Sequence, residues 1–175
     1  RQQTGVPRTL VMGVVNVTPD SFSDGGSWFD EGHAVEHGLE LVAQGAAIVD
    51  VGGESTRPGA ERPCEQEELR RVVPVVRRLA EAGVVVSVDT MRASVGREAV
   101  EAGAAIINDV SGGLADETMG RVVASTGALY VLMHWRAHSA AMQSEELTRY
   151  GDVVVEVRQE MLQRVDALLQ AGVGR

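Results

Sequence analysis

Residues 45–51 read Gly-Ala-Ala-Ile-Val-Asp-Val, and residues 103–108 read Gly-Ala-Ala-Ile-Ile-Asn, so one short pattern occurs twice in the chain. In each copy a glycine stands where a helix ends in the left-handed conformation and a strand rich in β-branched residues begins. Residues 83–89 and 127–133 repeat this arrangement. The runs are apolar without alternation, as in strands whose two faces are both covered. The pattern predicts a parallel sheet built from repeated strand–helix units.

The number of units sets the expected architecture. A further apolar strand at 10–15 makes five, each followed by a candidate helix, at about 31–44, 65–82, 92–102, 116–126 and 152–171. No Gly-x-Gly-x-x-Gly turn follows the first strand, which disfavours a dinucleotide-binding doubly wound sheet. We therefore predict an α/β TIM barrel, (β/α)₈. Because eight units need roughly 250 residues, we expect 1–175 to be a single, incomplete barrel domain that stops before strand six.

Charge and composition narrow the class of partner. The net charge of −9 at pH 7 argues against nucleic acid and against anionic membrane surfaces as partners. No apolar run approaches the ~20 residues of a membrane span. The single cysteine, Cys64, cannot form an internal disulfide, which fits a reducing, cytoplasmic location. An anionic small-molecule substrate stays open, because a local arginine, a metal ion or a helix N-terminus can reverse the field in a cleft.

Polar residues gather where the predicted strands end. Residues 16–26 read Asn-Val-Thr-Pro-Asp-Ser-Phe-Ser-Asp-Gly-Gly, and residues 52–60 read Gly-Gly-Glu-Ser-Thr-Arg-Pro-Gly-Ala. Residues 86–90 read Val-Ser-Val-Asp-Thr, and residues 106–113 read Ile-Ile-Asn-Asp-Val-Ser-Gly-Gly. All four segments fall at carboxyl ends of strands, which form the active face of barrels and doubly wound sheets alike. We therefore expect the reaction site at this edge.

These four segments, in this order, resemble the signatures of dihydropteroate synthase, the folate-biosynthesis enzyme and sulfonamide target. The resemblance runs from about Leu10 to the last predicted helix. It implies a pterin-binding transferase that joins 6-hydroxymethyl-7,8-dihydropterin diphosphate to p-aminobenzoate, giving dihydropteroate and pyrophosphate, with Mg²⁺ as cofactor. The family's later motifs, which follow strands six to eight, are not in this sequence. We therefore expect the chain alone to be weakly active or inactive.

The resemblance assigns roles in the first two loops. It makes Asn16 the metal and diphosphate contact, although an amide here could instead cap the turn before Pro19. Asp24 would face the cationic carbon and Phe22 would close over p-aminobenzoate; the alternative is an ordinary mobile surface turn. Thr56, Arg57 and Pro58 match the second loop, where Arg57 would bridge the diphosphate or the benzoate rather than remain solvated.

The third and fourth segments would form the pterin pocket, with residues Asp89, Asn108, Val110 and Met133. A carboxylate accepts hydrogen bonds and an amide both donates and accepts, so Asp89 and Asn108 can bind a pterin edge. Parity places Asn108 and Val110 on the inner face of the strand and Asp109 on the outer. The alternatives are a helix N-cap at residues 89–90 and a plain core role for Met133.

The other titratable side chains are better explained by structural roles than by catalysis or metal binding. We interpret His134, at the end of the fifth strand, as a wall of the pterin pocket or a loop anchor rather than a catalyst. His33 and His37 have a zinc-compatible spacing, but an exposed helix face explains them better. Residues 65–71, rich in glutamate and arginine, are interpreted as a solvated helix face with i,i+4 pairs.

Two other function classes stay open. A pterin-binding methyltransferase, which moves a methyl group from methyltetrahydrofolate to a corrinoid protein, would keep Asp89 and Asn108. It would have no diphosphate for Asn16 or Arg57. A non-catalytic paralogue would keep the fold as a partner or regulator. The resemblance also implies a homodimer, formed in the family through late helices that this sequence lacks.

Overall fold

The computed structural model describes residues 9–17, 31–54, 62–136 and 149–174. Strands and helices alternate along these residues, in the order β1 Met12–Asn16, α1 Glu31–Ala43, β2 Ile48–Gly52, α2 Glu65–Glu81, β3 Val86–Asp89, α3 Ala93–Glu101, β4 Ile106–Asp109, α4 Met119–Thr126, β5 Leu129–Leu132 and α6 Val153–Gln170. All the predicted elements are present. The helix–strand junctions at Gly45, Gly83, Gly103 and Gly127 have positive φ, as the sequence pattern predicts.

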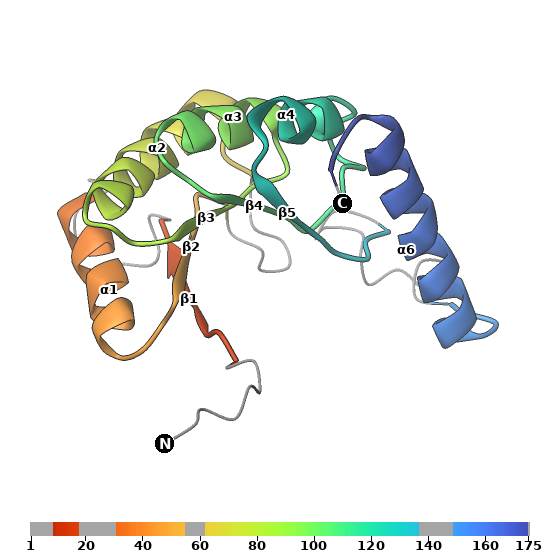
Figure 1. Cartoon of the computed structure of the whole chain (residues 1–175), viewed down its shortest axis with the longest axis horizontal. Helices are drawn as coiled ribbons and strands as arrows, with labels where there is room; N and C mark the ends of the chain where they lie inside the picture. The colour runs from red at the N-terminus through yellow and green to blue at the C-terminus, as the bar shows by residue number, and fades with distance from the viewer. Residues whose placement is uncertain (1–8, 18–30, 55–61, 137–148, 175) are drawn as a thin grey trace, which may run out of the picture.

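The sheet is parallel with the sequential strand order β1-β2-β3-β4-β5. Figure 1 shows the helices in an arc along one side of the sheet, which curves beneath them. A doubly wound sheet reverses its strand order and carries helices on both faces, so it is excluded. The fold is α/β, and the described residues form about five units of a (β/α)₈ barrel. Within these residues, no helix combines the length and the apolar character that crossing a membrane requires.

The core lies between the convex side of the sheet and the helices. Val49 and Val51 of β2 point into it, as does Val88 of β3, and all three are fully buried. Val76 and Leu79 of α2 pack against them from the helix layer. Burial of one such side chain contributes about 1.5–3 kcal/mol, so this layer fixes which face of each strand turns toward the helices.

The concave side differs, because several of its apolar side chains are exposed. Val14, Leu129 and Val131 are 54%, 69% and 41% exposed. The continuous apolar runs predict cover on both faces, and in the described residues only the convex face has it. The polar residues predicted to carry function alternate with the core valines and therefore belong to the concave side.

Asp109 shows how strand parity separates structural from functional side chains. As predicted, it points to the convex side, where it is fully buried. Its carboxylate accepts hydrogen bonds from the backbone N–H of Ser111 at 2.8 Å and of Gly113 at 3.0 Å, and from the hydroxyls of Ser111 and Tyr130 at 2.7 and 2.8 Å. It thereby ties the loop after β4 to β5. Burial, reinforced by Asp109, raises the pKa of Tyr130, so its hydroxyl stays a donor.

Replacing Asp109 tests this structural role. In Asp109→Asn the amide N–H₂ must face a backbone N–H whichever way it is turned, because each carboxylate oxygen accepts from one. We expect a loss of roughly 2–3 kcal/mol in the free energy of unfolding, since a buried donor loses its acceptor. Tyr130→Phe removes one hydrogen bond and should cost about 1 kcal/mol. Urea denaturation of both variants measures the difference, and equal losses would contradict the assignment.

Candidate functional site

Four residues lie in one row across the carboxyl ends of the first four strands. The parallel register pairs Asn16 with Gly52, Gly52 with Asp89, and Asp89 with Asn108. All four therefore share the concave face. Three residues that the sequence assigns to one site, from three different strands, are brought together here.

Gly52 keeps the middle of this row open. A Cβ atom at this position would lie 3.3 Å from Oδ2 of Asp89 and 3.7 Å from Oδ1 of Asn16. The oxygen atoms of Asn16 and Asp89 thus approach the same point from the two neighbouring strands. Any side chain at Gly52 would fill the space between them.

Asp89 carries the single carboxyl group of the row, and the pKa of this group is perturbed. Burial raises its pKa to about 7, and the negative charge of Asp50 adds to the effect, followed by more distant acidic groups. The helix-capping alternative is wrong for Asp89, because the Thr90 hydroxyl is the group that accepts from the backbone N–H of Arg92, at 3.1 Å. A carboxyl group poised to titrate near neutral pH is typical of functional sites.

Asp50 belongs to the site, and the sequence analysis missed it. It lies one layer below the row, 4% exposed, and its Oδ2 accepts a hydrogen bond from Nδ2 of Asn108 at 2.9 Å. The bond reaches across β3, which separates the two strands in the sheet. The only sequence signal is an acidic residue inside an apolar run, on the same face as Gly52. Ser87, paired in register with Asp50, is also buried here.

Val110 and Met133 follow the ends of β4 and β5. Val110 is half-buried, and Met133 is 47% exposed. The alternation along β5 places Met133 on the same side as the exposed Leu129 and Val131. Met133 is therefore outside the core formed by the described residues, and its side chain lies on the concave side, where it can contact a flat ring.

The second loop is closed at its base by an ion pair. Glu54, just before it, and Arg62, just after it, are joined by a 2.6 Å contact between Oε1 and Nε. Arg71 of α2 also donates to the carbonyl of Gly53 at 3.1 Å. The two ends of the segment 55–61 are therefore held together and against α2.

Glu68 anchors this base to the loop after β3, so the reading of residues 65–71 as a solvated face is wrong at Glu68, although Glu65 and Arg70 are exposed. The side chain is fully buried, accepts a 2.6 Å hydrogen bond from the Thr90 hydroxyl and pairs with the Arg92 guanidinium. Arg92 also donates to the carbonyl of Pro63 at 2.7 Å. Removing one member would leave a buried charge without compensation, which costs about 3–5 kcal/mol. Only Glu67 follows the expected pairing, with Arg71 at 2.7 Å.

Five predicted site residues lie outside the described residues. They are Phe22, Asp24, Thr56, Arg57 and Pro58. Their assignments stay predictions.

Magnesium can be tested against the donor atoms of the row. Asn16 supplies an amide oxygen and Asp89 a carboxylate oxygen, on either side of Gly52. Mg²⁺ prefers such hard ligands, keeps most of its waters and takes few protein ligands. Among the described residues, no three His, Cys, Asp or Glu side chains form a metal cluster. The donor atoms of Asn16 and Asp89 therefore fit Mg²⁺.

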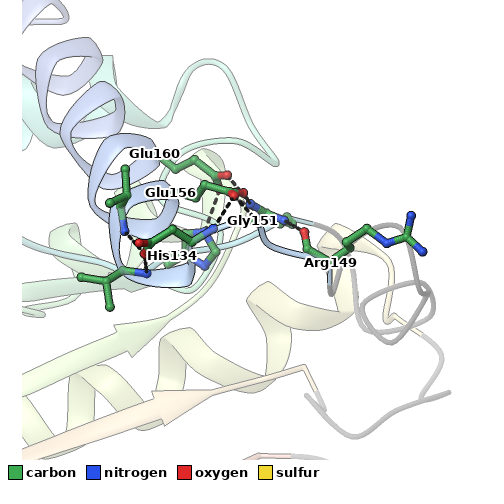
Figure 2. Close-up of polar contacts among 9 residues, drawn as sticks. His134, Arg149, Gly151, Glu156 and Glu160 are labelled. Atoms are coloured by element: carbon green, nitrogen blue, oxygen red, sulfur yellow. Dashed lines mark hydrogen bonds and ion pairs between the residues drawn. The ribbon is translucent and has the colours of Figure 1, made fainter.

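His134 is a loop anchor rather than part of the row. Its Nε2 lies 2.7 Å from Oε2 of Glu160 on α6, and Arg136 bonds the same carboxylate, with a 2.5 Å contact to Oε1. Arg136 also contacts Glu156 and stacks over the Tyr150 ring at 3.9 Å. Figure 2 shows this cluster joining the end of β5 to the first turns of α6. Of the two readings, the structure favours the anchor. His33 and His37 lie on an exposed face of α1.

Comparisons of this chain with protein families and with curated proteins agree with one another. A family described as pterin binding enzyme matches residues 12–175. A dihydropteroate synthase of Mycobacterium leprae is 57% identical over 163 residues, which are 93% of this chain and 57% of that protein. The chain therefore spans little more than half the length of this curated relative.

Solved structures agree with this likeness. Dihydropteroate synthase of Xanthomonas albilineans with 4-aminobenzoic acid superposes with a TM-score of 0.85 at 44% identity, covering 96% of this chain and 59% of the other. The same enzyme in complex with 7,8-dihydropteroate gives a TM-score of 0.80 at 43% identity, over 96% and 58% of the two chains.

The raised pKa of Asp89 predicts a pH-dependent contribution to stability. The folded chain keeps this proton up to about pH 7, whereas the unfolded chain loses it near pH 4. The folded state binds more protons between these values, so the contribution of Asp89 to the free energy of unfolding falls as the pH rises from about 4 to about 7, then stays constant.

Asp89→Asn removes the titrating group. The quantity of interest is the free energy of unfolding of the variant minus that of the unchanged protein. We expect this difference to be larger at pH 8 than at pH 5, by on the order of 2 kcal/mol. Urea denaturation at both pH values measures this. The same stability difference between variant and unchanged protein at pH 5 and pH 8 would contradict the raised pKa.

Proposed function

The chain belongs to the pterin binding enzyme family, and from this premise we propose that its protein is a dihydropteroate synthase. The reaction joins 6-hydroxymethyl-7,8-dihydropterin diphosphate to p-aminobenzoate and releases pyrophosphate. The observation that carries the proposal is the row of Asn16, Asp89 and Asn108 around Gly52. In this row the amide oxygen of Asn16, which suits a hard metal ion, lies near Asp89 and Asn108, which suit the hydrogen-bonding edge of a pterin. All three residues lie at the carboxyl ends of barrel strands.

The chemistry explains why such a site needs both parts. The aniline nitrogen of p-aminobenzoate is a weak nucleophile, so departure of pyrophosphate must supply much of the activation. Positive charge on the phosphates favours departure, and a carboxylate near the pterin methylene stabilises the cationic carbon that develops. Mg²⁺, when bound, supplies part of the charge that neutralises the diphosphate.

The row divides these tasks between its two ends. Asn16 would hold Mg²⁺ through its amide oxygen and so set the position of the diphosphate. Asp89 and Asn108 would bind the hydrogen-bonding edge of the pterin, with Val110 and Met133 against its flat face. Since Asp89 titrates near pH 7, ring N–H donors favour its ionised form and lower its pKa on binding.

The first two loops would complete the site. Asp24 would stabilise the cationic carbon and Phe22 would cover p-aminobenzoate. Arg57 would bridge an anionic group of either substrate, and Thr56, beside Pro58, would bind phosphate through its hydroxyl and backbone N–H. The Glu54–Arg62 ion pair supports this proposal, because it joins the two residues that flank the second loop, and Glu54 follows Gly52 of the row by two positions.

We further propose a cytoplasmic, homodimeric enzyme that acts on small molecules. The exposed, unpaired Cys64 fits a reducing compartment, and the family resemblance motivates the dimer. Light scattering of the purified protein tests the dimer directly.

The activity itself is tested by Mg²⁺-dependent incorporation of labelled p-aminobenzoate into dihydropteroate. The 175-residue chain is assayed beside the product of its gene read to the natural stop codon. In the latter, Asn16→Ala should lower kcat/KM by roughly 10²-fold or more, because charge stabilisation at the leaving group is lost. Gln44→Ala is the matched control, since it removes an exposed amide at the end of α1 and should leave the rate unchanged.

The other readings are decided in the same experiment. A silent protein that binds methyltetrahydrofolate more tightly than the pterin diphosphate would replace the synthase with a methyltransferase. A protein that binds pterin but turns over neither the pterin diphosphate nor methyltetrahydrofolate would be a non-catalytic paralogue. Equal activity of Asn16→Ala and Gln44→Ala would remove Asn16 from the metal site.

A further inference from the structure

Asp50 makes one contact that determines what the site offers to a ligand. Its Oδ2 accepts from Nδ2 of Asn108 at 2.9 Å, inside a layer where both Asp50 and Ser87 are buried. The other carboxylate oxygen of Asp50 has no hydrogen-bond partner among the described residues. A buried carboxylate so poorly supplied with donors depends strongly on the one it has.

This contact fixes the orientation of an amide. A carboxamide can be turned so that either its oxygen or its nitrogen faces a given neighbour, and its partners decide which. A carboxylate only accepts, so the nitrogen of Asn108 must face Asp50. The oxygen is then turned away from Asp50, and no described residue donates to it. Asn108 is half-buried beside Asp89, its register partner in the row.

We propose that Asp50 is a positioning residue that holds the Asn108 carboxamide with its oxygen toward the ligand, so that Asn108 acts on the pterin as a hydrogen-bond acceptor only. This inference rests on the proposed pterin-binding function. Without Asp50 the amide could present either atom, and the pocket would tolerate ligands with different donor patterns.

This orientation of the Asn108 amide restricts which hydrogen-bonding groups a ligand can present to Asn108 and Asp89. Asn108 supplies an amide oxygen and the ionised form of Asp89 supplies a carboxylate, on adjacent strands. Two neighbouring acceptors match two neighbouring donors, and a pterin has such a pair in its 2-amino group and the adjacent ring N–H. A carbonyl in place of the amino group would set oxygen against oxygen. Sites built to bind a donor discriminate strongly against an analogue that lacks it.

The placement of Asp50 agrees with a role in the site rather than in the core. It lies on the concave face, whereas the apolar core lies on the convex face. It is also the charged neighbour that contributes most, after burial, to the raised pKa of Asp89. Asp50 thus acts on both groups of the proposed pterin-binding pair.

The test measures discrimination between two ligands by titration calorimetry of the full gene product. Pterin carries the 2-amino group, and lumazine has a carbonyl there. We expect a preference for pterin that falls by about tenfold or more in Asp50→Ala, since the amide is then free to turn. Asp50→Asn, whose carbonyl can still accept from Nδ2 of Asn108, should retain most of it. Ser87→Ala, in the same buried layer, should retain all of it.

A swap of the two side chains tests the direction of the bond and keeps the volume of the layer, so it also decides the case if Asp50→Ala fails to fold. Asn108→Asp alone sets two carboxylates against each other and should weaken pterin binding. In the double variant with Asp50→Asn, the introduced amide donates to the introduced carboxylate, whose second oxygen is again an acceptor for the ligand. The double variant should recover the preference for pterin.

Opposite results would overturn the inference. If Asp50→Ala keeps the preference, or weakens both ligands equally, Asp50 does not orient Asn108 toward the ligand. Failure of the swap to recover the preference has the same meaning. If the unchanged protein binds neither ligand, the proposed pterin-binding function itself fails, which is a separate outcome established before any variant is measured.

Discussion

Burial of apolar side chains, mostly valine, on the convex face of the strands is the constraint on which the other features depend. Val49 and Val51 are sealed against the helices, so the residues that alternate with them, Asp50 and Gly52, must face the opposite side. The same rule turns Asn108 to the concave side and Asp109 to the convex side. A slip of one residue in β2 or β3 would put Asp50 or Asp89 into the core and the valines into the site. The core thus fixes the site without contacting a ligand.

The three acidic residues Glu68, Asp89 and Asp109 have different tasks. Asp109 is satisfied by four donors and holds a loop. Glu68 is satisfied by Thr90 and Arg92 and joins two loops. Asp89 has burial and like charges around it instead of donors, and its pKa is raised as a result. A carboxylate with compensating partners stabilises the fold, whereas one without them remains available for a ligand.

Local sequence patterns predicted the elements and much of the row. Gly45 and Gly103 could be read as the points where a strand begins, because their positive φ is a local property of the chain. The alternation of side chains along the fourth strand placed Asn108 correctly on the concave face. Contacts between distant residues carry no such signal. Asp50 meets Asn108 across 58 positions, and Glu68 meets Thr90 across 22, so neither role could be read from its neighbours in the chain. The charged composition of residues 65–71 even suggested that Glu68 was solvated.

The strand order also bears on how the chain is synthesised. Each of β2, β3 and β4 pairs only with the strand before it and the strand after it. When β2, β3, β4 or β5 leaves the ribosome, the preceding strand with which it pairs is therefore already outside. Pairing of each new strand with the strand before it favours stepwise folding from the N-terminus. The row from Asn16 to Asn108 is complete in the growing chain once β4 has emerged, before β5 is free to pair.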